Sequence, residues 1–282
     1  MHYNSKIRIL AYFSFAMAIF LLGVNLYGLT QSLRPQGLSP DVLRFGEYDV
    51  TLDSNQLLEQ IERRKNESKL EYARRLTHVY ADGVAHVDWE RYEPDKFNQR
   101  VPLWENFILF AMGHVSNIPE FERYHFSNPR KSIERGIGIC GDASMTISSL
   151  LNEQGIQNEI LTTPGHVMVE AQIDGHFYLL DGDFGVFLER GIDYYRKHPD
   201  EMVRAFRSQL GRTNDGEKLI ATNIAEKGVT RWNGSKHFIT KKYYFEKLAY
   251  PLKWIIPILL LVFSFIVLLK RPITLSVKNK KS

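Results

Sequence analysis

Two long apolar runs lie near the two ends of the chain. The first covers residues 9–30, with Ser14 and Asn25 as its main polar interruptions, and the second covers residues 252–269. A helix needs about 20 apolar residues to cross a hydrocarbon core about 30 Å thick. The first run reaches this length and the second comes close to it, so we expect two membrane-spanning helices.

A signal peptide or a soluble core helix fits these two runs less well. The apolar core of a signal peptide has about 7–15 residues and is followed by small residues at the cleavage site. The first run is longer, and its Ala16-Met-Ala18 motif lies in its middle. The second run lacks the polar face of a soluble core helix, and Tyr250 and Trp254 stand where an aromatic belt would lie. Pro257 falls in its first turn, where proline is tolerated.

Basic residues indicate a topology. Two spans place both termini on one side, where Lys6 and Arg8 precede the first span. Five basic residues follow the second span: Lys270, Arg271, Lys278, Lys280 and Lys281. They favour cytoplasmic tails at residues 1–8 and 270–282, whereas the basic segment Lys236 to Lys253 argues for the opposite orientation. We expect a two-pass membrane protein whose intervening domain is periplasmic or extracellular.

The region between the spans is long enough for one sizeable core. Apolar residues at helical spacing in 57–61 and 70–79 predict a helical first part, residues 31–123. Residues 124–190 form the predicted catalytic core, and residues 191–250 form the C-terminal part of the domain.

Two predicted strands flank Asp174-Gly175, a strong signal for a tight β-hairpin. The strands would run from His166 to Ile173 and from His176 to Asp181. A two-residue turn pairs Ile173 with His176 and, further along, His166 with Asp183. His166, Asp181 and Asp183 then share one face of the sheet, where either carboxylate is within reach of the imidazole.

Composition and charge exclude several classes of protein and of binding site. The chain is 44% apolar and 24% charged, as is ordinary for a folded protein. Its net charge of +4 comes partly from clusters near the ends, so nucleic acid is not an expected partner. The single cysteine excludes an intrachain disulfide. Six further histidines show no metal-ligand spacing and are predicted to be surface or core residues: His78, His86, His114, His125, His176 and His198.

That single cysteine, Cys140, lies at a predicted helix start. Glycines precede it at 136 and 138, and apolar residues at helical spacing follow it as far as Gly155, a residue typical of a helix end. Free backbone N–H groups and the helix dipole favour a thiolate at this position and can bind an oxyanion. A lone cysteine is more often a small buried hydrophobe. The nearby imidazole–carboxylate pair favours a catalytic triad instead.

Three motifs resemble the transglutaminase-like superfamily, a papain-related group. The first is Gly138-Ile-Cys140-Gly-Asp142, the second joins His166 to Glu170, and the third joins Tyr178 to Asp181. Together they cover roughly residues 124–190. The chain departs from the family pattern at three positions: Met168, Ser144 and Gly182.

The resemblance implies an α+β, papain-like core with Cys140 as nucleophile, His166 as base and Asp181 as orienter, Asp183 being the alternative. It also implies that the aromatic helix near residues 102–110 packs under the cysteine-bearing helix. The cysteine N–H would be one oxyanion donor, and the sequence does not identify a second. No metal or organic cofactor is expected.

The function expected from these features is that of a membrane-anchored thiol enzyme. It would act on amide or peptide bonds of a substrate in the cell envelope, as a cysteine peptidase or amidase or as a transglutaminase-type acyltransferase. The acyl acceptor, water or an amine, and the oligomeric state stay open. The alternative is a non-catalytic envelope protein that keeps the fold as a binding scaffold, for example in surface polymer assembly.

Overall fold

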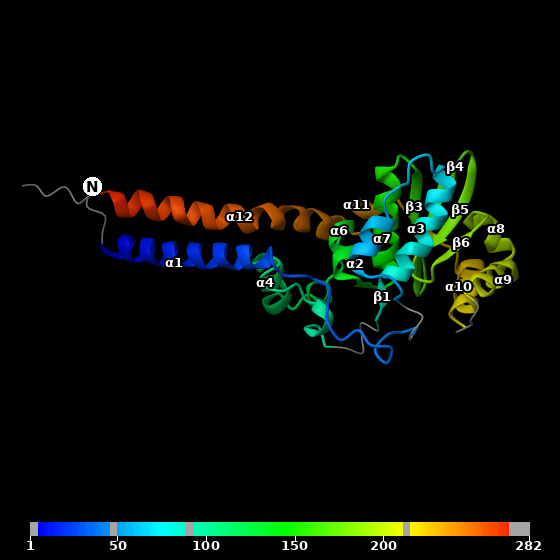
Figure 1. Ribbon diagram of the computed structural model, residues 1–282, viewed down its shortest axis with the longest axis horizontal. Coiled ribbons are helices and arrows are strands. Elements are labelled where there is room, and N and C mark those ends of the chain that lie inside the picture. The colour runs from blue at the N-terminus through cyan, green and yellow to red at the C-terminus, as the bar shows by residue number, and fades with distance from the viewer. Residues whose placement is uncertain (1–4, 46–49, 88–92, 211–214, 271–282) are drawn as a thin grey trace, which may run out of the picture.

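The computed structural model describes residues 5–45, 50–87, 93–210 and 215–270. The expected tails beyond Lys270 and before Ser5 therefore lie outside the described residues. Two long helices, α1 (Ser5–Gly28) and α12 (Thr240–Leu269), run antiparallel and side by side away from a mixed helix-and-sheet domain (Figure 1). Both are long and apolar enough to cross a membrane, which is consistent with a membrane protein.

The helix α12 begins well before the second apolar run. It starts at Thr240 and includes Pro251 and Pro257 in its interior, so the expectation that Pro257 lies in the first turn is wrong. The helix continues upstream because this segment packs on the domain, where Glu246 and Ala249 are buried. Packing can outweigh the backbone hydrogen bond that each proline removes.

The sheet contains five strands in the order β6-β5-β4-β3-β7, and every neighbouring pair is antiparallel. The bounds are Gln157–Thr163 for β3, His166–Ile173 for β4, His176–Asp181 for β5, Val186–Leu188 for β6 and Thr230–Trp232 for β7. Asp174 and Gly175 join β4 to β5 with φ of 50° and 81°. These are the left-handed angles of a tight hairpin turn, and Ile173 pairs with His176 as predicted.

Helices cover both faces of the sheet. The helices α3 (Lys69–Gly83) and α7 (Cys140–Glu153) share an apolar core with Ile160, Val169 and Leu180 of the sheet. On the other face, Leu161, Met168 and Leu179 pack with α8 (Ile192–Lys197), α9 (Pro199–Leu210) and α10 (Gly216–Lys227). His166 and Asp181 therefore belong to the face opposite α7, since side chains alternate along a strand.

Shorter elements connect these layers. They are α2 (Ser54–Gln60), the 3₁₀ turn η2 (Lys96–Asn98), α5 (Pro119–Glu122), α6 (Pro129–Arg135) and α11 (Gly234–Phe238). A two-stranded parallel pair joins β1 (Ala85–His86) to β2 (Ile137–Gly138), directly upstream of α7. This pair places His86 opposite Gly138, two residues before Cys140.

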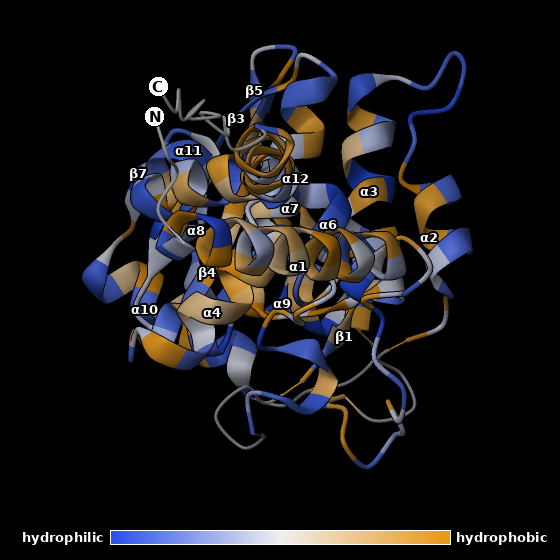
Figure 2. Cartoon of the chain, turned by 90° about the vertical axis from the view of Figure 1, so that its left-hand side faces the viewer, coloured by the Kyte–Doolittle hydropathy of each residue, from blue (hydrophilic) through white to orange (hydrophobic). Residues whose placement is uncertain are grey.

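The aromatic helix α4 (Phe107–Val115) is not where the resemblance predicted it. Its buried Leu109 shares a core with Tyr124 and with Ala249 of α12, and α3 packs against α7 instead. The loop before α4 packs closely against the last turn of α1. A Cβ on Gly28 would lie only 2.1 Å from the Trp104 carbonyl oxygen, so the approach requires glycine. Figure 2 shows α4 in hydrophobic colours beside α1. Hence α4 belongs to the junction between the domain and the two long helices.

Candidate active site

Asp142 fixes the first turn of α7 and thereby the position of Cys140. Its Oδ2 accepts the backbone N–H of Ile139 at 3.0 Å and lies 2.8 Å from Nδ1 of His125. A Cβ on Gly138 would lie 2.9 Å from the Asp142 Cβ, so the close approach requires glycine. This contact gives the Gly-x-Cys-x-Asp spacing a physical reason.

The carboxylate of Asp142 is fully buried yet stays charged. Burial alone would raise its pKa, but the His125 imidazole, the Arg135 guanidinium and the Ile139 N–H together lower the pKa below its usual 3.8. Arg135 Nη2 lies 3.6 Å from Asp142 Oδ1. The negative charge beside the first turn also suits the positive end of the helix dipole.

His166 is held by Asp181. The His166 Nε2 and Asp181 Oδ2 atoms are 2.7 Å apart, and both side chains are buried. The second oxygen of Asp181, Oδ1, accepts the backbone N–H groups of Asp183 and Phe184, each at 3.1 Å. Both carboxylate oxygens are therefore used, which fixes the plane and position of the imidazole.

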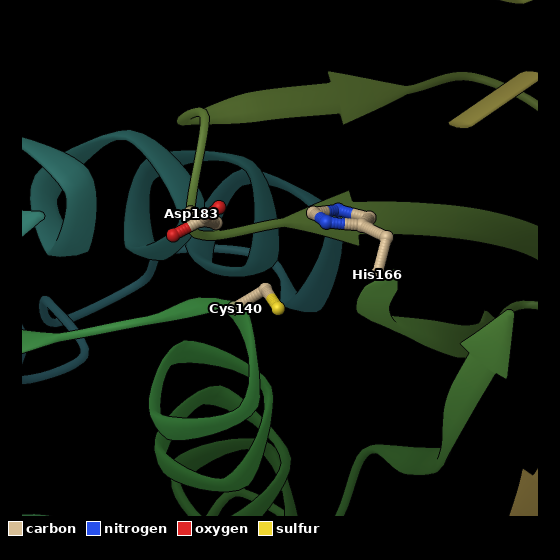
Figure 3. A group of neighbouring side chains, drawn as sticks. All are labelled: Cys140, His166 and Asp183. Atoms are coloured by element: carbon tan, nitrogen blue, oxygen red, sulfur yellow. The ribbon is translucent and has the colours of Figure 1, made fainter. Parts of the chain in front are cut away.

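Cys140 approaches His166 from the start of α7 (Figure 3). The Cys140 sulfur, a ring nitrogen of His166 and a carboxylate oxygen of Asp183 all lie within 4.8 Å of one another. Since Nε2 of His166 binds Asp181, Nδ1 is the nitrogen left to exchange a proton with the thiol. Cys140 itself is only partly exposed.

The imidazole of His166 favours its charged form. Burial by itself would lower its pKa, but the charge and hydrogen bond of Asp181, together with Cys140, raise the pKa well above 6.5. A protonated imidazole next to a thiol stabilises the thiolate. The arrangement therefore places an imidazolium beside the Cys140 sulfur.

Asp183 belongs to a second imidazole–carboxylate pair. His86 Nδ1 pairs with Asp183 Oδ1, and Arg44 Nη1 lies 3.5 Å from Oδ2. Arg44 also lies 2.7 Å from His86 Nε2. Asp181 and Asp183, which the sequence left as alternatives for orienting His166, thus have different partners.

His86 and Arg44 are parts of the site that sequence reasoning missed, since it predicted His86 to be a surface or core residue. Their place at the site depends on β1–β2 pairing and on the contact of Arg44 N–H with the His86 carbonyl oxygen at 2.8 Å. These contacts join segments far apart in the chain. No spacing motif could have indicated them.

The same cluster offers ligand atoms of the kinds that bind metal ions. A sulfur, a nitrogen and an oxygen within 4.8 Å of one another could be bridged by a tetrahedral ion such as zinc. Asp183, however, already carries His86 and Arg44 on its two oxygens. His166 Nε2 is likewise already bound, to Asp181 at 2.7 Å.

A mixed helix-and-sheet domain with a close Cys-His-Asp group matches the class expected from the sequence motifs. Residues 64–202 match the family model of a transglutaminase-like domain. The chain therefore contains a transglutaminase-like domain, which lies between two apolar helices. The match takes in α3 as well as the three sequence motifs. No curated protein and no solved structure matches the chain.

Proposed function

We propose that this protein is a membrane-anchored thiol enzyme that acts on amide or peptide bonds through Cys140, His166 and Asp181. The observation that carries the proposal is the fixed imidazole: His166 is bound to Asp181 through Nε2 at 2.7 Å and keeps Nδ1 for the thiol at the start of α7. The transglutaminase-like match supports the same reaction class.

The reaction would proceed in two steps. His166 takes the thiol proton, and the Cys140 sulfur attacks the carbonyl carbon of an amide. The backbone N–H at the start of α7 binds the resulting oxyanion, and the imidazolium returns its proton to the leaving amine. This leaves a thioester on Cys140. Water then releases the acid, or a second amine takes over the acyl group.

The proposed setting is the outer side of a membrane. The domain would act as a periplasmic or extracellular unit on a peptide or other amide-bearing molecule of the cell envelope. The two apolar helices support membrane attachment, and the basic tails in the sequence support the orientation.

Activity-based labelling tests the proposal. The full chain in membranes is treated with a peptidyl acyloxymethyl ketone, which alkylates activated cysteines, and the labelled peptide is mapped. We expect labelling at Cys140, its loss in His166→Ala, and no change in His176→Ala. His176 is an exposed histidine at the start of β5 and serves as the matched control. If labelling occurs only after unfolding, the proposal of a thiol enzyme is wrong and the non-catalytic scaffold is the better explanation.

A further inference from the structure

An apolar groove lies on the side of the domain that faces the two long helices. It has a volume of about 670 Å³ and runs between the α4–α5 region and the start of α12. Six apolar residues line its walls: Met112, Ile118, Phe121, Phe238, Ile239 and Phe245. Volumes of this size are typical of sites for small organic ligands.

One wall of the groove continues into the lipid-facing surface of α12. Starting from Phe245 in the groove, exposed apolar side chains follow at Leu248, Leu252, Ile255 and Leu259, with exposed fractions of 60%, 37%, 45% and 61%. At about 100° per residue, these five positions fall within an arc of about 80°. They form one stripe that leads from the groove into the apolar span.

The opposite wall also starts at the membrane end of the domain. The helix α4 follows the loop in which Trp104 packs on Gly28 at the end of α1. Val115, the last residue of α4, is 76% exposed, and Ile118, which follows α4 and lines the groove, is 40% exposed. A hydrocarbon chain could therefore pass from the bilayer into the groove without crossing water.

The mouth of the groove is basic. His237 and Lys241, both exposed, line it together with a single acid, Glu120, whereas the ammonium of Lys242, a further lining residue, lies over the Tyr124 ring at 5.0 Å. Lysines at a membrane surface attract anionic headgroups. Apolar walls with a basic mouth complement a lipid that has a phosphate headgroup.

We propose that this groove binds an anionic membrane lipid, with a hydrocarbon chain lying along the edge-to-face pair of Phe121 and Phe245, whose ring centroids are 5.3 Å apart, and the phosphate at Lys241. The stripe on α12 distinguishes a lipid from an apolar peptide, because it connects the groove to the bilayer rather than to solvent. The proposal concerns a separate region from the cysteine cluster and does not depend on the enzyme activity.

Photo-crosslinking tests this proposal. The full chain is placed in nanodiscs that contain phosphatidylglycerol with a diazirine in its acyl chain, and the crosslinked peptides are mapped after irradiation. We expect crosslinks in residues 112–121 and 238–245, in addition to the lipid-exposed end of α12 near Phe263. The latter crosslinks serve as an internal standard, since Phe263 faces outward in the span.

Two variants and one matched control make the result specific. Ile118→Asp should lower the groove crosslinks about tenfold relative to the α12 standard, because it places a charge where the chain lies. Lys241→Glu should abolish the preference for the phosphatidylglycerol probe over a phosphatidylcholine probe. Leu219→Asp, at a 61% exposed position on α10, should change neither. An unchanged thermal unfolding midpoint shows that each variant keeps the fold.

Three outcomes would overturn the proposal. The first is labelling of the α12 standard without labelling of the groove peptides. The second is undiminished groove labelling in Ile118→Asp. The third is displacement of the lipid probe by inorganic phosphate alone, which would make the region an anion site without a lipid chain.

Discussion

The His86 imidazole and the Asp183 carboxylate form a buried pair directly beside the candidate nucleophile. Burial alone would raise the pKa of Asp183, but His86, with smaller contributions from His166 and Arg44, holds it below the usual 3.8. A lasting negative charge thus lies within 4.8 Å of both the thiol sulfur and the imidazole of His166. The two neighbouring aspartates, so similar in the sequence, should therefore respond differently to substitution.

Asp181→Asn should be the more severe of the two Asp→Asn changes. The amide keeps the shape but spoils imidazole orientation and stabilisation of the imidazolium, which lowers the rate about 10⁴-fold in the serine-protease case. Asp183→Asn should cost much less, because its carboxylate holds His86 and not His166. The acylation rate with p-nitrophenyl acetate measures both. A loss confined to Asp183→Asn would refute the assignment of Asp181 as orienter.

Cys140 should react with iodoacetamide at pH 6. An ordinary thiol has a pKa of about 8.5 and is almost entirely protonated there. The raised pKa of His166 keeps an imidazolium beside the sulfur at that pH, and this cation is lost only as the pH rises through the folded-state pKa. His166→Ala should remove most of the reactivity at pH 6, and Cys140→Ser should abolish labelling, since the chain has one cysteine. Mass spectrometry of the alkylated peptide gives the rate.

Breaking the second pair should destabilise the fold. His86→Ala removes the largest stabilising partner of the buried Asp183 charge and leaves only the weaker contributions of His166 and Arg44, and removing one partner of a buried pair costs about 3–5 kcal/mol. The double variant His86→Ala/Asp183→Asn should recover part of this loss, as read from denaturant unfolding. Additive losses would show that the two residues do not interact.

The same pair predicts a pH dependence. Because the pKa of Asp183 is lower in the folded than in the unfolded chain, the stability it contributes is present above about pH 4. That contribution disappears as the pH falls through the folded-state pKa. Below about pH 4, the free energy of unfolding should therefore decrease less steeply with falling pH in Asp183→Asn than in the unsubstituted protein.

Gly182→Ala should perturb the contact between the β5 end and the cysteine helix. A Cβ at this position would lie 2.3 Å from Cδ1 of Ile147, a buried residue of α7. Overpacking of this kind costs about 1–3 kcal/mol of unfolding free energy. Ile147→Val removes the clashing atom, so the double variant should be more stable than Gly182→Ala. Equal stability of the two would mean that the clash is relieved by another movement.

Reporter fusions test the expected topology. Reporters at either terminus should be cytoplasmic, and one inserted near Gly37 should be external. An alkaline phosphatase fusion, active only outside, and a green fluorescent fusion, bright inside, give opposite signals at each site. Termini on opposite sides would remove one span from the topology.

Sequence patterns predicted the parts of the site that depend on interactions between residues close together in the chain. The start of α7 at Cys140 follows from glycine spacing and the reach of Asp142 to Ile139, and the β4–β5 register follows from Asp174-Gly175. A hairpin with a two-residue turn leaves no freedom in register. His166 and Asp181 could therefore be placed together from the sequence alone.

Long-range packing was not predictable in the same way. The extension of α12 to Thr240 depends on buried contacts such as that of Glu246 Oε2 with the Tyr124 hydroxyl at 2.9 Å, and α4 packs near α12 for the same reason. The pairing of His86 with Asp183 depends on where β1 joins β2. Such contacts leave no periodic pattern in the sequence.

The junction between the long helices and the domain has a mechanical consequence. Asn25 of α1 donates to the Lys253 carbonyl oxygen of α12 at 2.7 Å, and Lys253 donates to the Glu105 carbonyl oxygen at 2.6 Å. Glu105 also accepts the Tyr250 hydroxyl at 2.7 Å. With both helices in a bilayer, these bonds would leave no hinge at the membrane surface. The domain would therefore be held at a fixed distance from the bilayer. The thiol would then reach only those bonds that lie at one height above the membrane.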